Sequence, residues 1–324
     1  MKIAAYNYRD FDERLFFDKF AKEYDVEIVP IVDTPSVDNT ILAQGCDAIS
    51  VITKPVTREM IEGFAKVGVK HISTRTIGYD HIDLEAAREY GIAVSNVTYS
   101  TGSVADYAVM LILMSLRRMK SVMKRAEGMD YSLPGSIGRE IADLTIGVVG
   151  TGKIGTHVIR NLSGFGCDII AYDPYPNDEA AGLATYASLD EVFAKADVIT
   201  FHTPATKDSF HMVNADSIAK MKDGVILVNT ARGSIIDTPA LIDSLESGKI
   251  GGAALDVIEG ELGLYYGDYK YQIKGPREMA VLKSFPNVLM LPHMAFYTEN
   301  AVSDMVEHSI QHIVNKDGNV VPFA

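Results

Sequence analysis

Short apolar runs alternate with longer charged segments of helical character along the whole chain. The first five runs cover residues 2–8, 26–32, 48–53, 69–74 and 92–97, and six more cover residues 145–150, 168–173, 197–202, 224–230, 251–257 and 287–293. Short strands that alternate with helices indicate βαβ units and parallel sheets. The pattern therefore predicts an α/β protein with two doubly wound parallel-sheet domains. Six strands in the second series is the number expected of a Rossmann dinucleotide-binding domain.

A single long helix is predicted between the two series of strands. Ser103 and Asp106 loosely fit a capping box, an apolar run follows, and basic residues precede Gly128 at the end. Because the start of this helix is apolar nearly all round, we expect it to be buried between domains or at a subunit interface. A homodimer is expected for this reason. From Thr298 onward, a last helix is predicted to return to the first domain.

Composition narrows the class of protein and its partners. The chain has 324 residues, enough for about two domains, and its 30 basic and 43 acidic residues give a net charge of −13. An acidic protein repels phosphate backbones, so nucleic acid is not expected as a partner. The N-terminus lacks the apolar core of a signal peptide, and the most apolar run, residues 107–116, has about half the length of a membrane span. With two isolated cysteines besides, we expect a cytoplasmic protein that binds no membrane.

A glycine-rich turn follows the first strand of the second series. Gly150, Gly152 and Gly155 have the spacing G-x-G-x-x-G, with a strand before them and a helical stretch after them. The first glycine allows a tight turn, the second lets a pyrophosphate approach the backbone, and the third lets helix and strand pack closely. The spacing alone also occurs in ordinary glycine turns. Here the strand and the helix favour dinucleotide binding at the helix N-terminus.

The next strand ends in an acidic residue, Asp173, which lies 18 positions after Gly155. A carboxylate at this place accepts hydrogen bonds from the adenosine ribose and repels a 2′-phosphate. The alternative is a solvated acid in a turn before Pro174. In the context of the glycine turn, Asp173 favours NAD over NADP.

Three polar residues stand at or just beyond the ends of later strands, where open α/β sheets bind their ligands. The planar guanidinium of Arg232 suits bidentate binding of a carboxylate. His293 can exchange a proton near neutral pH, and a neighbouring carboxylate such as Glu261 would favour its charged form. Alone, such an arginine is more often a surface residue and such a histidine a structural one. Their order after a coenzyme fingerprint favours an active site.

A second pair of histidines lies on the predicted last helix. His308 and His312 are four residues apart, so they could share one face and bind a metal. The residues between them lack the glutamate of a zinc-protease motif, and no further ligand is evident. A solvated or interfacial pair is favoured, and no metal is expected.

Four stretches, GVVGTGKIG, HTPATKDSFHMVNADSIAKMKDGVILVNTARGSIID, GGAALDVIEGE and LPHMAFYT, together resemble the D-isomer-specific 2-hydroxyacid dehydrogenases. The resemblance covers nearly the full length of the chain. It implies a flavodoxin-like substrate domain formed by both chain ends, residues 1–99 and 298–324. A Rossmann NAD-binding domain, residues 100–297, would be inserted between them.

The resemblance also implies a reaction and residue roles. NADH would reduce a 2-oxo acid to a D-2-hydroxy acid, with Arg232 on the substrate carboxylate, His293 as acid/base and Glu261 keeping His293 charged. Implied NAD contacts are Gly150, Gly152, Lys153, Ile154, Gly155, Asp173, Thr203, Pro204, Thr230, Ala231, Arg232 and Asp256. Implied substrate contacts are Ile77, Gly78, Tyr99, Arg232, His293, Phe296 and Tyr297.

Two departures from the family pattern concern the substrate. Glu261 is followed by Leu-Gly and a tyrosine-rich loop instead of proline, which resembles the D-lactate and D-2-hydroxyisocaproate branch. The stretches ISTRTIGYDHID and SVADYAVMLILM resemble the D-lactate dehydrogenases of vancomycin-resistance operons and phenyllactate dehydrogenases. Met294 stands where lactate enzymes usually have threonine, so the resemblance does not determine the shape of the substrate pocket. Pyruvate to D-lactate is the first choice, and bulkier 2-oxo acids, as in D-2-hydroxyisocaproate or phenyllactate dehydrogenases, are the alternative.

Two other functions are less favoured. An NADH-sensing scaffold, similar to corepressors that share the family fold, is disfavoured by the acidic composition. A formate dehydrogenase is expected to pair its histidine with glutamine, whereas this chain offers Glu261.

Overall fold

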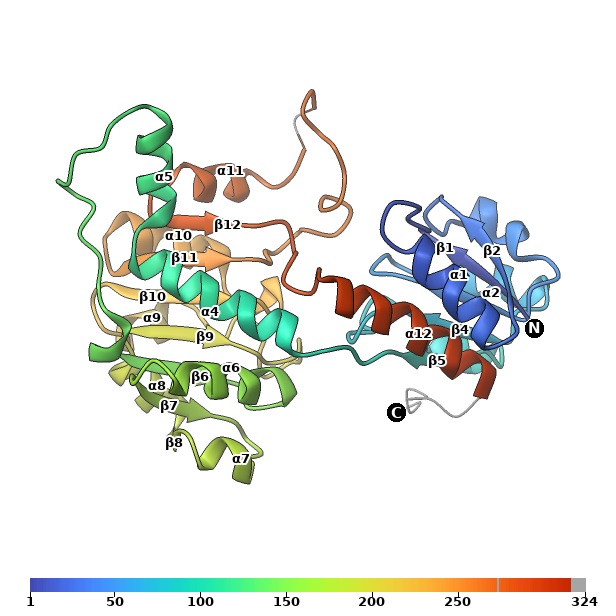
Figure 1. Ribbon diagram of the computed structural model, residues 1–324, viewed down its shortest axis with the longest axis horizontal. Helices are drawn as coiled ribbons and strands as arrows, with labels where there is room; N and C mark the ends of the chain where they lie inside the picture. The colour runs from blue at the N-terminus through green and yellow to red at the C-terminus, as the bar shows by residue number, and fades with distance from the viewer. Residues whose placement is uncertain (273, 316–324) are drawn as a thin grey trace. The chain divides into compact units, whose positions relative to one another are not determined.

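The structure is a computed structural model that describes residues 1–272 and 274–315. The chain divides into two compact units (Figure 1): unit 1 comprises Met1–Ser100 and the segment from Tyr297 onward, and unit 2 comprises Thr101–Phe296. The predicted domain boundaries differ from these by one residue at each junction. The last predicted stretch, residues 316–324, lies outside the described residues.

Unit 1 contains a five-stranded parallel sheet in the order β2-β1-β3-β4-β5, which is the flavodoxin-like order. Its strands are β1 (Lys2–Tyr6), β2 (Glu27–Ile31), β3 (Ala48–Val51), β4 (His71–Thr74) and β5 (Ala93–Asn96). Its helices are α1 (Arg14–Glu23), α2 (Arg58–Lys66), α3 (Leu84–Glu89) and α12 (Glu299–Asn315), with a 3₁₀ segment η1 (Val37–Ala43). The five strands predicted for the first series are confirmed.

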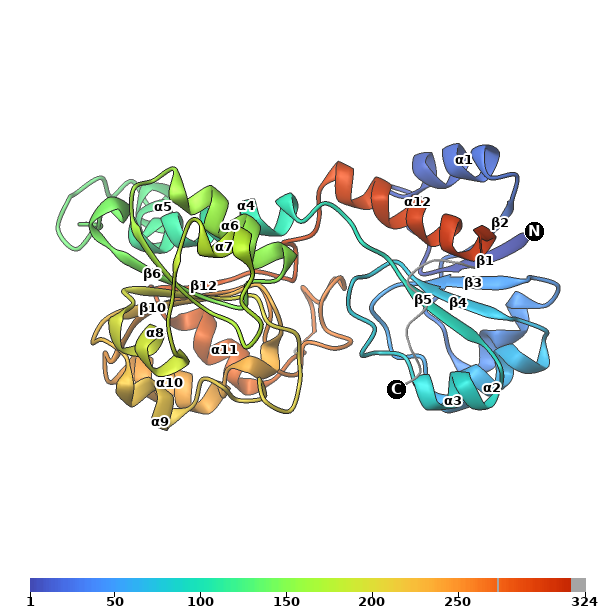
Figure 2. The same cartoon turned by 90° about the horizontal axis from the view of Figure 1, so that it is seen from below.

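Helices cover both faces of this sheet (Figure 2). α1 and α12 lie on one face, and α2 and α3 lie on the other. Phe17 and Phe20 of α1 pack with Val306 and Ile310 of α12 in one apolar cluster, which anchors the returning end of the chain on unit 1. The predicted return of the last helix to the first domain is therefore confirmed.

Unit 2 contains a seven-stranded parallel sheet in the order β12-β11-β10-β9-β6-β7-β8. Its strands are β6 (Thr145–Val149), β7 (Asp168–Tyr172), β8 (Thr185–Tyr186), β9 (Val198–Phe201), β10 (Val225–Asn229), β11 (Ile250–Leu255) and β12 (Val288–Met290). The strand order reverses between β6 and β9, as in a Rossmann fold. The six predicted strands are confirmed, and β8 was missed because two residues carry no pattern.

Helices also cover both faces of the second sheet (Figure 2). One face carries α4 (Gly102–Leu116), α6 (Lys153–Ser163) and α7 (Asp178–Ala181), and the other carries α8 (Leu189–Lys195), α9 (Ala215–Lys220), α10 (Thr238–Glu246) and α11 (Arg277–Ser284). The remaining elements are α5 (Met119–Glu127) and the 3₁₀ turns η2 (Ile141–Asp143) and η3 (Gly233–Ile235). No helix in the described ranges is both long and apolar enough to cross a membrane.

The predicted single long helix is wrong, because two helices, α4 and α5, occupy this stretch. Arg118 adopts a left-handed conformation with φ of 51°, which interrupts the helical backbone. A distant segment closes the end of α4, since Arg139 donates its backbone N–H to the oxygen of Leu116 at 3.1 Å. Gly138 passes so close that a Cβ atom there would lie 2.8 Å from the same oxygen. The interruption depends on residues that are distant in sequence, so local periodicity did not show it.

The predicted capping box at the start of this helix is also wrong. α4 begins at Gly102 after Thr101, and the side chain of Thr101 makes no capping hydrogen bond. Ser103 lies inside the helix, and Asp106 accepts a hydrogen bond at 2.8 Å from Asn161 of α6. The buried face of α4 thus packs within unit 2.

Candidate active site

The glycine turn connects β6 to α6 through close backbone contacts. Gly150 has φ of 94°, and a Cβ atom there would lie 2.8 Å from the backbone of His202. A Cβ atom on Gly155 would lie 1.9 Å from the oxygen of Gly150. By contrast, a Cβ atom on Gly152 would have no protein atom within 4 Å. Packing therefore requires Gly150 and Gly155, whereas Gly152 leaves space beside the N-terminus of α6.

Asp173 follows β7 and holds the glycine turn. One carboxylate oxygen accepts the backbone N–H of Thr151 at 2.6 Å, and the other accepts the N–H of Tyr175 at 2.8 Å. Each carboxylate oxygen has capacity for a further hydrogen bond. Asp173 therefore ties the turn to the end of β7 and keeps acceptor capacity for a ribose hydroxyl.

Three buried polar atoms lie at the carboxyl ends of β9 and β10. The Nδ1 atom of His202 and the Oγ1 atoms of Thr203 and Thr230 have no hydrogen-bond partner among the described residues. Burial lowers the pKa of His202 to about 3, so its imidazole is neutral. Buried polar atoms are usually hydrogen-bonded, and atoms beside a glycine turn suit the polar groups of a dinucleotide. The residues present therefore fit NAD.

Arg232 is held at the end of β10 by a buried asparagine. Asn229 accepts the backbone N–H of Ala231 at 3.0 Å and donates its side-chain amide to the oxygen of Arg232 at 2.8 Å. The guanidinium of Arg232 donates to the oxygen of Ala231 at 2.8 Å. Asn229 thus fixes the turn from which the half-buried arginine side chain projects.

Glu261 and His293 form the polar pair that the sequence predicted. The Nδ1 atom of His293 lies 2.6 Å from Oε1 of Glu261, and their side chains are 23% and 16% exposed. A carboxylate only accepts hydrogen bonds, so Nδ1 carries the proton. The second oxygen of Glu261 accepts the backbone N–H of Ile258 at 2.7 Å. The pair orients the imidazole ring and places a negative charge beside it.

Asp256 holds the chain around His293. Its backbone oxygen accepts the N–H of His293 at 2.8 Å, and its carboxylate accepts the N–H groups of Met294 and Ala295 at 2.8 and 2.9 Å. His293 has φ of 55°, a left-handed conformation that is uncommon outside glycine. Burial raises the pKa of the Asp256 carboxyl. The carboxylate is fully buried, and besides this turn the side chain of Tyr107 in α4 forms a hydrogen bond with it.

Three loops that follow β9, β10 and β11 are joined by His211. Its Nε2 atom lies 2.7 Å from Glu259, and its backbone N–H donates to the oxygen of Ser234 at 2.8 Å. Glu259 also accepts the hydroxyl of Thr238 at 3.1 Å. A Cβ atom on Gly233 would lie 2.2 Å from the backbone of Ile258, so two of these loops are in direct contact. The loops that carry Arg232 and Glu261 are therefore one connected structure.

The predicted substrate residues of unit 1 lie beyond β4 and β5. The oxygens of Thr76, Ile77 and Gly78 accept hydrogen bonds from the N–H of Val97, the amide of Asn96 and the hydroxyl of Thr76, respectively. These contacts fix the conformation of the turn that carries Ile77 and Gly78. Tyr99 lies in the loop between β5 and α4.

Tyr297 opens the returning segment of unit 1. Its hydroxyl donates to Asp12 at 2.6 Å, and the guanidinium of Arg9 lies 5.8 Å from its ring centroid. Burial and the Asp12 carboxylate raise the pKa of Tyr297 to about 12. Phe296, the preceding residue, belongs to unit 2 and packs its ring 6.5 Å from that of His293.

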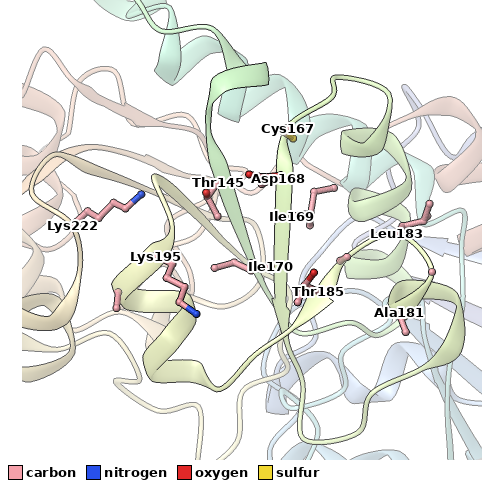
Figure 3. Close-up of a pocket in the computed structure, with 13 residues that line it drawn as sticks. Thr145, Cys167, Asp168, Ile169, Ile170, Ala181, Leu183, Thr185, Lys195 and Lys222 are labelled. Atoms are coloured by element: carbon pink, nitrogen blue, oxygen red, sulfur yellow. The ribbon is translucent and has the colours of Figure 1, made fainter.

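A cavity of about 770 Å³ lies elsewhere in unit 2 (Figure 3). Thr145 and Asp168, the first residues of β6 and β7, line it, together with Lys195 and Lys222. The glycine turn and Asp173 lie at the opposite ends of the same two strands. This cavity is therefore separate from the candidate site.

His308 and His312 lie on one face of α12, with their rings stacked at an angle of 11°. Each Nδ1 atom contacts a backbone oxygen, that of Thr98 for His308 and that of Asn96 for His312. Among residues 1–272 and 274–315, no group of three or more histidine, cysteine or acidic side chains could hold a metal ion. These contacts are structural and join α12 to the end of β5 and the residues just after it.

The comparisons with known proteins agree with this geometry. Residues 109–295 match the family described as D-isomer specific 2-hydroxyacid dehydrogenase, NAD binding domain. The chain belongs to the D-isomer-specific 2-hydroxyacid dehydrogenases. This dehydrogenase uses NAD, as its coenzyme domain indicates.

Similar proteins cover almost the whole dehydrogenase chain. An aromatic 2-oxoacid reductase of Clostridium sporogenes is 45% identical over 318 residues, which cover 97% of this chain and 95% of that protein. A D-lactate dehydrogenase of Lactiplantibacillus plantarum is 42% identical over 314 residues, which cover 96% of this chain and 94% of that protein. The solved structure of a D-lactate dehydrogenase of Treponema pallidum has a TM-score of 0.89 at 33% identity, and 99% of each chain is covered.

Several residues of the site were missed by sequence reasoning. Asn229 is the last residue of β10, three positions before Arg232, and His211 is one of several isolated histidines. Tyr266 lies in the tyrosine-rich loop that the sequence pointed out, and its hydroxyl donates to the oxygen of His293 at 2.8 Å. His211 and Tyr266 act through contacts with residues distant in sequence, and Asn229 acts through a local turn. Only Tyr266 had a signal, the departure of its loop from the family pattern.

Proposed function

We propose that this dehydrogenase reduces 2-oxo acids to D-2-hydroxy acids with NADH. The contact between Nδ1 of His293 and Glu261 carries this proposal, because it leaves Nε2 as the ring nitrogen that exchanges a proton with the substrate. Glu261 favours the charged imidazole until the proton is transferred. Arg232, fixed at the end of β10, binds the substrate carboxylate through its planar guanidinium. Ile77, Gly78, Tyr99, Phe296 and Tyr297 are the further substrate-binding residues we propose.

The coenzyme is assigned to the carboxyl ends of β6, β7, β9, β10 and β11. When bound, NADH supplies the hydride that reduces the carbonyl carbon. The proposed contacts are Gly150, Gly152, Lys153, Ile154, Gly155, Asp173, Thr203, Pro204, Thr230, Ala231, Arg232 and Asp256. His293 transfers its proton to the forming alkoxide while the protein shields the reacting groups from water.

Two substrates remain candidates. Pyruvate, reduced to D-lactate, is supported by the similarity to D-lactate dehydrogenases. A 2-oxo acid with an aromatic side chain, such as phenylpyruvate, is supported by the similarity to an aromatic 2-oxoacid reductase and by the rings of Tyr266 and Phe296 near His293. Aromatic walls accommodate both small and large apolar groups, with about 10- to 200-fold discrimination between near neighbours.

A panel of 2-oxo acids assayed with NADH tests this proposal. Pyruvate, 2-oxobutyrate, 2-oxoisocaproate and phenylpyruvate should all be reduced, and chiral chromatography should show only D products. NADH binding without turnover of any of these acids would favour an NADH-sensing scaffold. Formation of L-lactate would contradict the proposed arrangement of Arg232 and His293. We also propose a cytoplasmic location and a homodimer.

A further inference from the structure

The loop between β11 and α11 contains four tyrosines that the proposed reaction does not use: Tyr265, Tyr266, Tyr269 and Tyr271. Tyr266 differs from the others because it contacts the proposed acid/base. Its hydroxyl donates to the backbone oxygen of His293 at 2.8 Å. Its own backbone has φ of 69°, so Tyr266 and His293 are both non-glycine residues in the left-handed region.

Two residues hold the backbone of His293, one at its N–H group and the other at its oxygen. Asp256 accepts its backbone N–H and holds the following two N–H groups through its carboxylate. Tyr266 supplies a donor to its backbone oxygen. A left-handed conformation at a bulky residue persists only when the surroundings hold it, and catalytic geometry is sensitive to shifts of about 1 Å. The hydroxyl of Tyr266 therefore contributes to the placement of the imidazole.

The ring of Tyr266 is part of an aromatic cluster. Its centroid lies 6.4 Å from the His293 ring and 6.4 Å from the Phe296 ring, which it meets edge to face at 87°. Phe296 is 9% exposed, whereas Tyr266 is 49% exposed. The buried ring supports the cluster, and the half-exposed ring of Tyr266 offers apolar surface beside the imidazole. A substrate side chain that reaches this surface would gain from an aromatic contact.

We propose that Tyr266 has two separable roles in the proposed reaction, and this inference rests on the proposed function. Its hydroxyl makes it a positioning residue for His293. Its ring makes it a specificity-determining residue that favours 2-oxo acids with aromatic side chains. The first role affects every substrate equally, because every substrate receives its proton from His293. The second role affects only substrates large enough to reach the ring.

Tyr266→Phe tests the first role, because it removes only the hydroxyl. The kcat for pyruvate and for phenylpyruvate should fall by the same factor, about three- to tenfold, which is the range one net hydrogen bond is worth. The KM for NADH should not change. Tyr269→Phe is the matched control, since Tyr269 lies in the same loop and its hydroxyl donates to Gly263 at 3.2 Å. Equal kcat values in the two variants would overturn the positioning role.

Tyr266→Leu tests the second role by removing the ring as well. The ratio of kcat/KM for phenylpyruvate to that for pyruvate should fall about three- to tenfold relative to Tyr266→Phe, the range of a lost aromatic pair. An unchanged ratio would overturn the specificity role. Near- and far-ultraviolet circular dichroism of both variants should match the unsubstituted protein, so that a folding defect is recognised.

The positioning role also has a readout that does not need turnover. NMR spectra of protein with ¹³C-labelled histidine measure this. The His293 signal is the one that disappears in His293→Gln. Its chemical shift should change in Tyr266→Phe and stay the same in Tyr269→Phe. If the unsubstituted protein reduces neither acid, the proposed function and the specificity role fail together. The positioning role is then decided by this signal alone, and an unshifted signal would overturn it.

Discussion

At the scale of single residues, the carboxylates of the site are held by backbone N–H groups as much as by side chains. Glu261 contacts Ile258 and His293, Asp173 contacts Thr151 and Tyr175, and Asp256 holds the turn around His293. Backbone donors fix a carboxylate in place. These three acids therefore shape the turns around the glycine motif and the histidine, besides the direct roles proposed for them.

Glu261→Gln should weaken catalysis by removing the negative charge beside His293. An amide has one acceptor oxygen where the carboxylate has two, so it cannot accept from both Nδ1 of His293 and the N–H of Ile258. A hydrogen bond to a charged group is worth about 1.5–3 kcal/mol, so kcat/KM for pyruvate should fall by about 10- to 100-fold. The KM for NADH should change little. Steady-state kinetics with pyruvate and NADH measure this, and a variant with near-native kcat/KM would contradict the role of the contact between Glu261 and His293.

Asp173→Asn should change the coenzyme preference. The unsubstituted dehydrogenase should prefer NADH to NADPH strongly, because a 2′-phosphate would meet the carboxylate at close range. In the variant, the difference in affinity between NADH and NADPH should be smaller, mainly because NADH binds more weakly. Since Asp173 also accepts the N–H of Thr151, some loss of affinity for both coenzymes is expected. Fluorescence titration with each coenzyme measures the gap, and equal affinities in the unsubstituted protein would contradict the role of Asp173.

At the scale of elements, the strands and most helices could be predicted because local periodicity specifies them. The eleven predicted strands correspond to the short apolar runs, and the glycine spacing marked the turn between β6 and α6. The break at Arg118 could not be predicted, because residues near position 139 close the end of α4. His211 and Tyr266 were missed for the same reason. The partners of His211 and Tyr266 are set by tertiary packing, which a single sequence does not display, whereas Asn229 contacts its near neighbours Ala231 and Arg232 through a turn that the strand pattern does not show.

His211→Ala should weaken the connection between the loops that carry Arg232 and Glu261. The histidine links Glu259 to Ser234, and a hydrogen bond to a charged group contributes about 1.5–3 kcal/mol. We expect kcat/KM for the 2-oxo acid to fall about tenfold, with little change in NADH affinity. His211→Gln keeps a donor near the position of Nε2 and should recover most of the activity. Alanine and glutamine variants of equal activity would show that this contact does not position the loops.

At the scale of the whole molecule, each unit has its own apolar cores and its own buried histidine. His71 of unit 1 is 7% exposed and contacts the hydroxyl of Ser95 at 2.7 Å. Burial, with a smaller effect of His312, lowers the pKa of His71 from 6.5 to about 4. The unfolded chain therefore binds a proton at a pH where the folded chain does not. The stability that this histidine contributes is complete above pH 6.5 and is lost as the pH falls toward 4.

Acid should therefore destabilise unit 1 through His71. At pH 5 the loss attributable to this residue should be about 2 kcal/mol relative to pH 7.5. His71→Gln removes the titrating group, so the variant, although less stable at pH 7.5, should lose about 2 kcal/mol less between the two pH values. Urea unfolding at pH 7.5 and pH 5 measures the difference. If variant and unsubstituted protein lose the same amount, His71 is not the acid-sensitive group.

The proposed homodimer has a different basis from the one the sequence suggested. The buried face of α4 is used within unit 2, where it packs on α6 and the sheet. A group of exposed apolar side chains lies instead on the segment after α5, drawn in green at the left of Figure 1. Met129, Tyr131, Leu133 and Ile137 are each 75–85% exposed. Such a concentration of exposed apolar surface is typical of an interface.

One arginine orders this segment, which argues against a merely flexible loop. Arg125 pairs with Asp130 at 2.7 Å and donates to the oxygens of Ser132 and Pro134, both at 2.9 Å. Leu133→Glu combined with Ile137→Glu should therefore convert a dimer to a monomer, because burying two carboxylates without partners is strongly unfavourable. Light scattering after size-exclusion chromatography measures the mass, with Tyr271→Glu on another exposed loop as the control. A monomeric unsubstituted protein would contradict the proposed homodimer, and a double variant that stays dimeric would place the interface elsewhere.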